Sequence, residues 1–284
     1  MREVSNENGR IQEMRNRIKY SQNFLTNSRL VESLINNSSI SANDTVIEIG
    51  AGEGIVTKEL IKKAKKVIAF ELDPNLFKKL SGKVQGEKSL ESKQEDFLTS
   101  NLPAHPYKVF SNIPFNITAA IIKKLTLGDN PPGDAYLIVQ KEAAMKFAGK
   151  PLDIINSQLS VILHPWFEFK VVYEFKTTDF FPRPSVDVIL LEIRKKEEPL
   201  VNNRNLYQDF VTHIFNQPKR SILPKNSRPS ELNFEDWLKL FDLFLARPQE
   251  KQKIVSGAFA KQSREQETLE KIHRTRVDKN WRQY

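Results

Sequence analysis

The sequence contains no cysteine and only four histidines among its 284 residues. The lack of cysteine excludes a disulfide framework, a thiolate zinc site and a cysteine nucleophile. Because His105, His164, His213 and His273 form no i, i+4 pair, we expect no metal site. No stretch reaches the roughly 18 apolar residues of a membrane span, and the first residues lack the apolar core of a signal peptide. We therefore expect a cytoplasmic protein that does not enter a membrane.

Positive charge is in excess, but it is unevenly distributed. Lysine and arginine outnumber aspartate and glutamate by 44 to 35, which gives a net charge of +9. Residues 31–200 balance to zero, whereas segments 1–30, 201–230 and 246–284 carry +3, +4 and +5. A neutral body with basic ends and a basic middle segment favours a polyanionic partner, most simply nucleic acid. Charge alone leaves open that the basic ends only keep the protein soluble.

Short apolar runs alternate with helical segments from Asp44 to about Lys196. The runs predict buried strands at 45–49, 67–72, 107–110 and 135–139, and the helical spacing predicts helices at 55–65, 75–82 and 118–127. This alternation predicts an α/β fold with a parallel, doubly wound sheet. After Pro165 the alternating residues of 167–173 and an apolar run at 186–193 predict an antiparallel pair that closes the sheet.

The pattern changes again near Pro199, where the strands stop. Helices are predicted at 206–216, 234–245 and 250–273, separated by turns that contain proline. We therefore predict three parts. They are a mobile basic arm at 1–20, an α/β domain at 21–198, and a small helical domain with a basic tail at 199–284.

A glycine-rich turn follows the first strand of the α/β pattern. Gly50, Gly52 and Gly54 stand where a helix is about to begin, so a ligand can approach bare backbone and helix N-terminal amides. Dinucleotide-binding loops have a third glycine at the sixth position, where this chain has Ile55. An NAD-dependent oxidoreductase is therefore the less favoured alternative, and the spacing fits an S-adenosylmethionine loop.

Two acidic residues follow the next two strands. Glu71 ends the second strand, 21 residues after Gly50, where a carboxylate can accept both ribose hydroxyls. Asp96 ends the third, where it can accept a hydrogen bond from an adenine amino group. Either acid alone would be read as a solvated loop residue, but their order at successive strand ends favours a nucleoside ligand.

The fourth strand ends in the sequence Asn112-Ile113-Pro114-Phe115. The exocyclic amine of a base is a weak nucleophile, because its lone pair is delocalised into the ring. The side-chain oxygen of Asn112 and the carbonyl of Ile113 can accept hydrogen bonds from that amine, and Phe115 can stack on a flipped base. The alternative is a tight turn with a core aromatic residue.

These motifs make the sequence resemble the ribosomal RNA adenine-N6 dimethyltransferases from about Lys19 to at least Leu245. The resemblance implies a Rossmann-like class I methyltransferase sheet with a small, all-helical C-terminal domain, in a monomer that acts on rRNA. The matching segments are Gln22–Leu25 (Q-N-F-L), the glycine loop Glu48–Gly54, the acids Glu71 and Asp96, the signature Asn112–Phe115, and Phe180–Pro184 (F-x-P-x-P).

The resemblance also implies a cofactor and a role for each matching residue. The cofactor is S-adenosyl-L-methionine, which is released as S-adenosyl-L-homocysteine, with no metal. Residues implied to bind it are Gln22, Asn23, Leu25, Gly50, Gly52, Glu71, Leu72, Asp96, Phe97 and Asn112. Residues implied to act in catalysis are Asn112, Ile113, Phe115 and Phe180, the last closing the base pocket opposite Phe115.

Two branches of this family modify different RNAs. The Erm branch methylates an adenine of 23S rRNA and confers macrolide, lincosamide and streptogramin B resistance, and the other branch modifies 16S rRNA during ribosome assembly. Phe115, Ser185 and the wording of 177–187 and 215–220 are more similar to Erm. We therefore favour 23S rRNA, with 16S rRNA or a non-catalytic RNA-binding relative as alternatives. Whether one or two methyl groups are added stays open.

Overall fold

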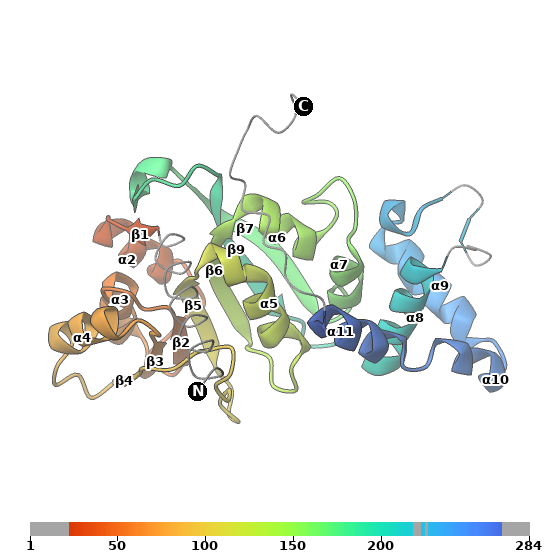
Figure 1. Cartoon of the computed structure of the whole chain (residues 1–284), viewed down its shortest axis with the longest axis horizontal. Helices are drawn as coiled ribbons and strands as arrows, with labels where there is room; N and C mark the ends of the chain where they lie inside the picture. The colour runs from red at the N-terminus through yellow and green to blue at the C-terminus, as the bar shows by residue number, and fades with distance from the viewer. Residues whose placement is uncertain (1–22, 218–222, 225–226, 269–284) are drawn as a thin grey trace, which may run out of the picture. The chain divides into compact units, whose positions relative to one another are not determined.

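The structure, a computed structural model, describes residues 23–217, 223–224 and 227–268 (Figure 1). The chain divides into two compact units between Leu200 and Val201. Several predicted features lie outside the described residues: the arm at 1–20, Gln22, the segment 218–220, and the tail beyond residue 268.

The first unit is built on a seven-stranded sheet with the strand order β4-β3-β2-β5-β6-β9-β7. Strands β4 to β6 are parallel, whereas β9 pairs antiparallel with both β6 and β7. The predicted α/β sheet with a closing antiparallel pair is thereby confirmed. The strands are β2 (Thr45–Ile49), β3 (Lys66–Phe70), β4 (Leu90–Lys93), β5 (Lys108–Asn112), β6 (Asp134–Gln140), β7 (Phe167–Phe175) and β9 (Val188–Lys195).

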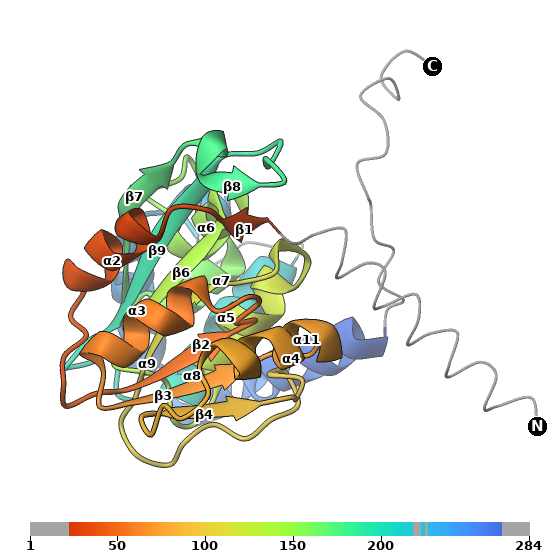
Figure 2. The same ribbon diagram turned by 90° about the vertical axis from the view of Figure 1, so that its left-hand side faces the viewer.

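Helices cover both faces of this sheet, with α2, α3 and α4 on one side and α5, α6 and α7 on the other (Figures 1 and 2). Asp73 caps α4 by accepting from the amides of Asn75 and Leu76, with Pro74 in the first turn. The sequence reading missed α2, α6 and α7. The helices are α2 (Ser28–Asn36), α3 (Ile55–Lys63), α4 (Pro74–Lys83), α5 (Thr118–Leu127), α6 (Lys141–Ala148) and α7 (Gln158–Leu163).

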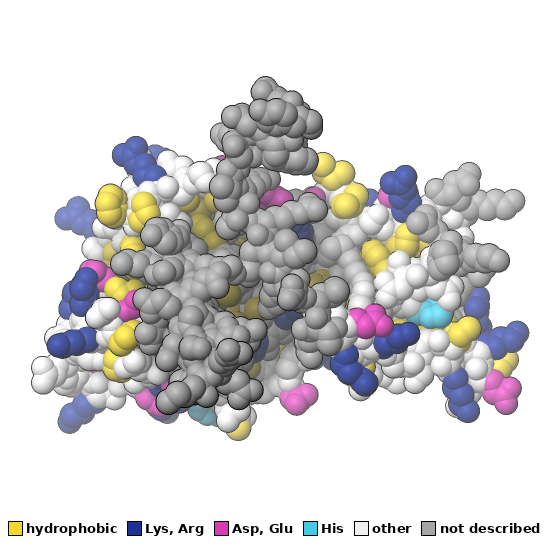
Figure 3. All heavy atoms as spheres, viewed as in Figure 1, with side chains coloured by type: hydrophobic (Ala, Val, Ile, Leu, Met, Phe, Trp, Pro, Cys, Tyr) yellow, Lys and Arg dark blue, Asp and Glu magenta, His cyan; other side chains and the backbone are white. Residues whose placement is uncertain are grey.

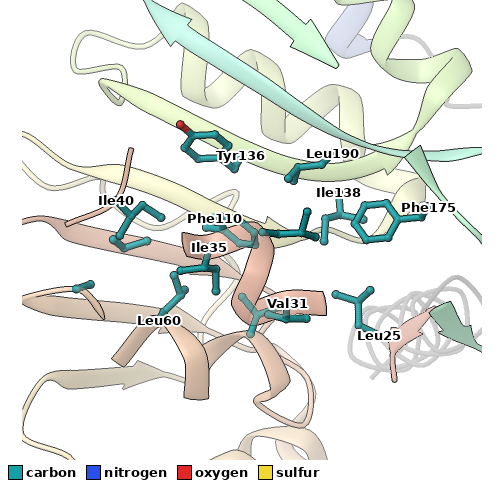
Figure 4. Packing of buried hydrophobic residues seen from close by; sticks show 14 of the residues in the cluster. Leu25, Val31, Ile35, Ile40, Leu60, Phe110, Tyr136, Ile138, Phe175 and Leu190 are labelled. Carbon is teal, nitrogen blue, oxygen red and sulfur yellow. The ribbon is translucent and has the colours of Figure 1, made fainter. Parts of the chain in front are cut away.

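The main core of this unit lies between the sheet and the helices α2 and α3. Figure 4 shows Ile35 and Leu60 from these helices close to Phe110 of β5. All three side chains are at most 1% exposed. Burying an aliphatic or aromatic side chain of this size contributes about 1.5–3 kcal/mol, so this layer fixes α3 and the turn before it on the sheet.

A second, two-stranded sheet joins segments that are distant in the chain. Strand β1 (Phe24–Leu25) pairs antiparallel with β8 (Phe180–Phe181), so that Phe24 faces Phe181 and Leu25 faces Phe180. The amide of Thr26 donates to the carbonyl of Asp179 at 3.0 Å, next to the short helix η2 (Thr177–Asp179). We call this pair of strands the β1–β8 ribbon.

The second unit is helical and has a core of its own. Phe210 of α8 lies 4.8 Å from Phe244 and 5.3 Å from Phe241 of α9, between ring centroids. The predicted single helix at 250–273 is wrong, because Gly257 takes a left-handed φ of +76° and separates α10 from α11. The elements are α8 (Arg204–Asn216), η3 (Pro229–Glu231), α9 (Phe234–Leu245), α10 (Gln249–Gln252), η4 (Lys253–Val255) and α11 (Ala258–Thr268).

The structure can be compared with two expectations from composition, namely the uneven distribution of positive charge and the lack of a membrane span. On the face shown in Figure 3, the Lys and Arg side chains of both units are spread among neutral and acidic ones. Three basic residues of the +4 segment, Lys219, Arg220 and Lys225, lie outside the described residues. Within the described part of the chain, no helix has the length and apolar character of a membrane span.

Candidate active site

A cavity of about 330 Å³ opens at the carboxyl ends of β2 and β5. Ligands of open α/β sheets bind at this edge, because the loops that follow parallel strands meet there. Among the residues that line it are six predicted site residues: Asn23, Leu25, Gly50, Gly52, Asn112 and Ile113. The structure therefore brings residues 23–25, the glycine loop and residues 112–114 together.

The glycine loop leaves its backbone bare toward this cavity. Gly50 and Gly52 have left-handed φ values of +72° and +57°, which residues other than glycine rarely adopt. A Cβ atom on Gly52 would lie 3.2 Å from the ring of Phe24, and one on Gly50 would lie 3.5 Å from Pro114. The loop thus has the bare-backbone cradle that an S-adenosylmethionine site requires.

Glu71 links the end of β3 to the glycine loop. Its side chain is 3% exposed and accepts hydrogen bonds from the amides of Gly52 and Asp73, each at 2.8 Å. Burial raises the pKa of Glu71, and these two hydrogen bonds oppose that shift. An ionised carboxylate has about four acceptor sites, so capacity remains for ribose hydroxyls.

Three further residues predicted to bind the cofactor, Leu72, Asp96 and Phe97, lie on the loops that follow β3 and β4, outside the lining of the cavity. Asp96 is half-buried and accepts from the amide of Leu98 at 2.8 Å. Phe97 is buried, with its ring edge-on to Phe70, and Leu72 is 39% exposed. Asp96 keeps acceptor capacity for an amino group, so the chemistry predicted for it remains available.

Lys124 of α5 organises this loop and was missed by the sequence reading. Its ammonium donates to the carbonyl of Leu98 at 3.0 Å and to that of Ser100, and it lies 5.0 Å from the ring centroid of Phe97. A lone lysine on an amphipathic helix reads as solvated, so the sequence gives no signal for this role.

Asn112 ends β5 beside the cavity, with its amide group already fixed. Its Nδ2 donates to the carbonyl of Asn23 at 2.8 Å, which leaves Oδ1 as the acceptor. The hydroxyl of Ser111 both donates to the carbonyl and accepts from the amide of Ile49, which holds β5 against β2. The oxygen predicted to accept from a base amine is therefore on a rigid support.

The two aromatic residues predicted to enclose a base lie in different surroundings. Phe115 begins the short helix η1 (Phe115–Ile117) and packs half-buried against the core. Phe180 is only 2% exposed, with its ring centroid 5.3 Å from that of Phe175. Phe180 therefore belongs to the core in this structure, and its place opposite Phe115 in a base pocket stays a prediction.

Glu48 lines the cavity from β2, and it was not among the site residues predicted from the sequence. It is 2% exposed and accepts from the hydroxyl of Thr57 at 2.6 Å. Burial, helped by the nearby charge of Glu71, raises the pKa of Glu48 to about 8. Glu48 is therefore mostly protonated at neutral pH. The sequence does carry a signal for a buried acid here, because Glu48 stands inside an otherwise apolar strand.

This geometry can be compared with known proteins. Residues 13–239 match the family described as ribosomal RNA adenine dimethylase. The chain belongs to this family. The resemblance drawn from the motifs is thereby confirmed, and the chain is an S-adenosylmethionine-dependent rRNA adenine N6-methyltransferase. When bound, the cofactor supplies an electrophilic methyl group, and the bare glycine loop and Glu71 fit it.

Relatives within the ribosomal RNA adenine dimethylase family carry two kinds of name. An rRNA adenine N-6-methyltransferase of Lysinibacillus sphaericus is 30% identical and covers 80% of this chain and 96% of its own length. A ribosomal RNA small subunit methyltransferase A of Mycoplasmopsis pulmonis is 30% identical, with 81% and 90% covered. The crystal structure of the 23S rRNA methyltransferase ErmE has a TM-score of 0.68 and 27% identity, with 78% and 98% covered.

Proposed function

We propose that the chain methylates N6 of one adenine of 23S rRNA in the cytoplasm and so confers resistance to macrolide, lincosamide and streptogramin B antibiotics. The observation that carries this proposal is the likeness to ErmE, which extends over 98% of that chain. Phe115, Ser185 and the segment 177–187 support the same branch by their resemblance to Erm sequences.

Asn112 and Ile113 would activate the adenine amine. The Oδ1 of Asn112 and the carbonyl of Ile113 accept hydrogen bonds from the amine and draw it toward a tetrahedral nitrogen, which is the geometry of the transition state. Both residues line the cavity, and the hydrogen bond from Asn112 to Asn23 holds the acceptor in place. Interactions that are stronger in the transition state than in the ground state increase the rate. Phe115 would stack on one face of the flipped base.

The remaining residues would position the cofactor. Glu71 would accept from the ribose hydroxyls and Asp96 from the adenine amino group. Asn23, Leu25, Gly50 and Gly52 would surround the methionine end, since they line the cavity beside Asn112. Fixing donor and acceptor together in this way supplies the near-attack geometry that methyl transfer needs.

The first unit would bind the cofactor, and the second unit would bind the RNA. The first unit contains the cavity and all described site residues. The second unit, with the basic segments on both sides of its helix α9, would hold the rRNA backbone. Such phosphate contacts make binding depend strongly on salt concentration.

Methylation of 16S rRNA is the second candidate, because the relative from Mycoplasmopsis pulmonis, which is named for the small subunit, is as similar as the one from Lysinibacillus sphaericus. The test maps reverse-transcription stops on rRNA from cells with and without the gene, using Asn112→Ala as the inactive control. A new stop in the peptidyl-transferase loop of 23S rRNA supports our proposal. A stop near the 3′ end of 16S rRNA overturns it in favour of the second candidate.

A further inference from the structure

Phe181 is an aromatic side chain left open at the edge of the site. It is 73% exposed, and it is the one aromatic residue among the strongly exposed large hydrophobic side chains of the described chain. Its neighbour Phe180, by contrast, is 2% exposed. Single exposed apolar residues are common on protein surfaces, so exposure alone does not indicate a function for Phe181 and its position must be considered as well.

The register of the β1–β8 ribbon shows on which side Phe181 lies. Residues directly opposite each other in an antiparallel pair project from the same face. Leu25 and Phe180 are one such pair, and both belong to the hydrophobic core. Phe24 and Phe181 are the other pair, and the ring of Phe24 approaches the glycine loop at Gly52. Phe181 therefore projects from the same face of the ribbon as Phe24, which is one of the residues that line the cavity.

Hydrogen bonds fix this position relative to the catalytic asparagine. The Nδ2 of Asn23 donates to the carbonyl of Pro182 at 2.7 Å, one residue after Phe181. The carbonyl of the same Asn23 accepts from Nδ2 of Asn112 at 2.8 Å. Two hydrogen bonds thus connect the backbone beside Phe181 to the residue that would hold the adenine amine.

We propose that Phe181 stacks on an unpaired base of the substrate RNA that is a neighbour of the methylated adenine. This inference rests on the proposed rRNA methylation and adds a specificity contact to it. The target adenine has to reach Asn112 in the cavity, whereas Phe181 stands open outside the cavity lining. An exposed ring is a surface for base stacking, and single-stranded RNA offers the unstacked bases it needs.

Arg183 adds a charge suited to the same strand of RNA. It is exposed, two residues after Phe181, and makes no ion pair within the described part of the chain. A guanidinium of this kind contacts phosphate oxygens without selecting a base sequence. We assign Arg183 to the phosphate that adjoins the stacked nucleotide.

The test measures methyl transfer from labelled S-adenosylmethionine to unmethylated transcripts of 23S and 16S rRNA. Phe181→Ala is expected to raise KM for the methylated transcript about tenfold. The kcat at saturating RNA and the Kd for S-adenosylmethionine stay within about twofold of wild type, since the ring contacts neither the cofactor nor the reacting amine. Phe181→Tyr and Phe181→Trp retain a low KM. Phe181→Leu, which is apolar but has no ring, does not.

A fluorescence measurement gives a readout that is independent of turnover. The tryptophan of Phe181→Trp is expected to be quenched by the transcript more strongly than that of Val172→Trp, an exposed position on β7 used as the matched control. Arg183→Ala should reduce the slope of the logarithm of the RNA binding constant against the logarithm of salt concentration by about 1, which corresponds to one phosphate contact.

Two outcomes overturn the inference while leaving the proposed function intact. One is an unchanged KM in Phe181→Ala while the wild type methylates its transcript, and the other is full activity of Phe181→Leu. If the wild type methylates neither transcript, the proposed function fails first. At a side chain this exposed, loss of folding is not expected to confuse the result, and thermal unfolding of each variant checks it.

Discussion

The two sides of the candidate site are built in different ways. The cofactor side uses bare backbone and buried groups: Gly50 and Gly52 with positive φ values, and Glu71 bonded to the loop it supports. The base side uses side chains from segments far apart in the chain, namely Asn112, Phe115 and the β1–β8 ribbon. Local sequence determines the first side, whereas long-range pairing determines the second, and substitutions should therefore affect them differently.

The largest effect is expected on the base side at Asn112. Asn112→Ala removes the acceptor for the adenine amine and should lower kcat at least about 100-fold. Binding of S-adenosylmethionine, measured by calorimetry, should change much less, because the glycine loop and Glu71 are untouched. Turnover equal to that of the wild type would show that Asn112 does not act on the amine.

Phe115 tests whether a ring is needed on the base side. Phe115→Ala should lower kcat/KM by about tenfold or more, since stacking on one base contributes about 1–3 kcal/mol. Phe115→Tyr keeps the ring and should lose little. An equal loss in the two variants, measured with the same transcript, would exclude stacking as the role of this residue.

Gly52 tests the cofactor side. Gly52→Ala places a Cβ 3.2 Å from the ring of Phe24 at a φ of +57°, so the free energy of unfolding should fall by about 1–2 kcal/mol. Affinity for S-adenosylmethionine should fall with it. Gly82→Ala is the matched control, because its Cβ would meet no atom within 4 Å in helix α4. That control should be neutral or gain up to about 1 kcal/mol in urea unfolding.

At Glu48 we expect the smallest effect on methyl transfer, together with a change in stability that depends on pH. The folded protein raises the pKa of Glu48 from 4.5 to about 8. Within this window the folded state holds a proton that the unfolded state has released, so the free energy of unfolding falls as pH rises. Glu48→Gln cannot titrate and should lose this dependence, which amounts to about 1.4 kcal/mol per pH unit inside the window. Urea unfolding at about pH 5 and about pH 8 measures it, and equal slopes in both proteins would contradict the assignment.

The sequence predicted most of the cofactor side because its signals are local. Gly50, Gly52 and Glu71 stand at strand ends that hydrophobic pattern alone identifies, and the predicted helix 118–127 has the observed bounds. The predicted adenine acid Asp96 also follows a strand, although β4 is short and ends at Lys93.

The base side was predicted less completely, because burial there depends on tertiary pairing. The F-x-P-x-P motif has two adjacent phenylalanines, and a motif cannot tell which of them enters the core. The pairing of Leu25 with Phe180 decides this by placing both side chains in one cluster. The buried proton of Glu48 and the contacts of Lys124 likewise arise only when separate segments meet.

The hydrogen bond between Asn112 and Asn23 explains why residue 112 is an amide and not an acid. A base amine needs only an acceptor, and a carboxylate would offer two. The carbonyl of Asn23, however, needs a donor, which Asn112 supplies at 2.8 Å. Aspartate would set a negative charge against that carbonyl and leave it unpaired. An amide at this position thus serves the segment near the start of the chain as well as the proposed substrate, and deamidation of Asn112 would break the hydrogen bond to Asn23.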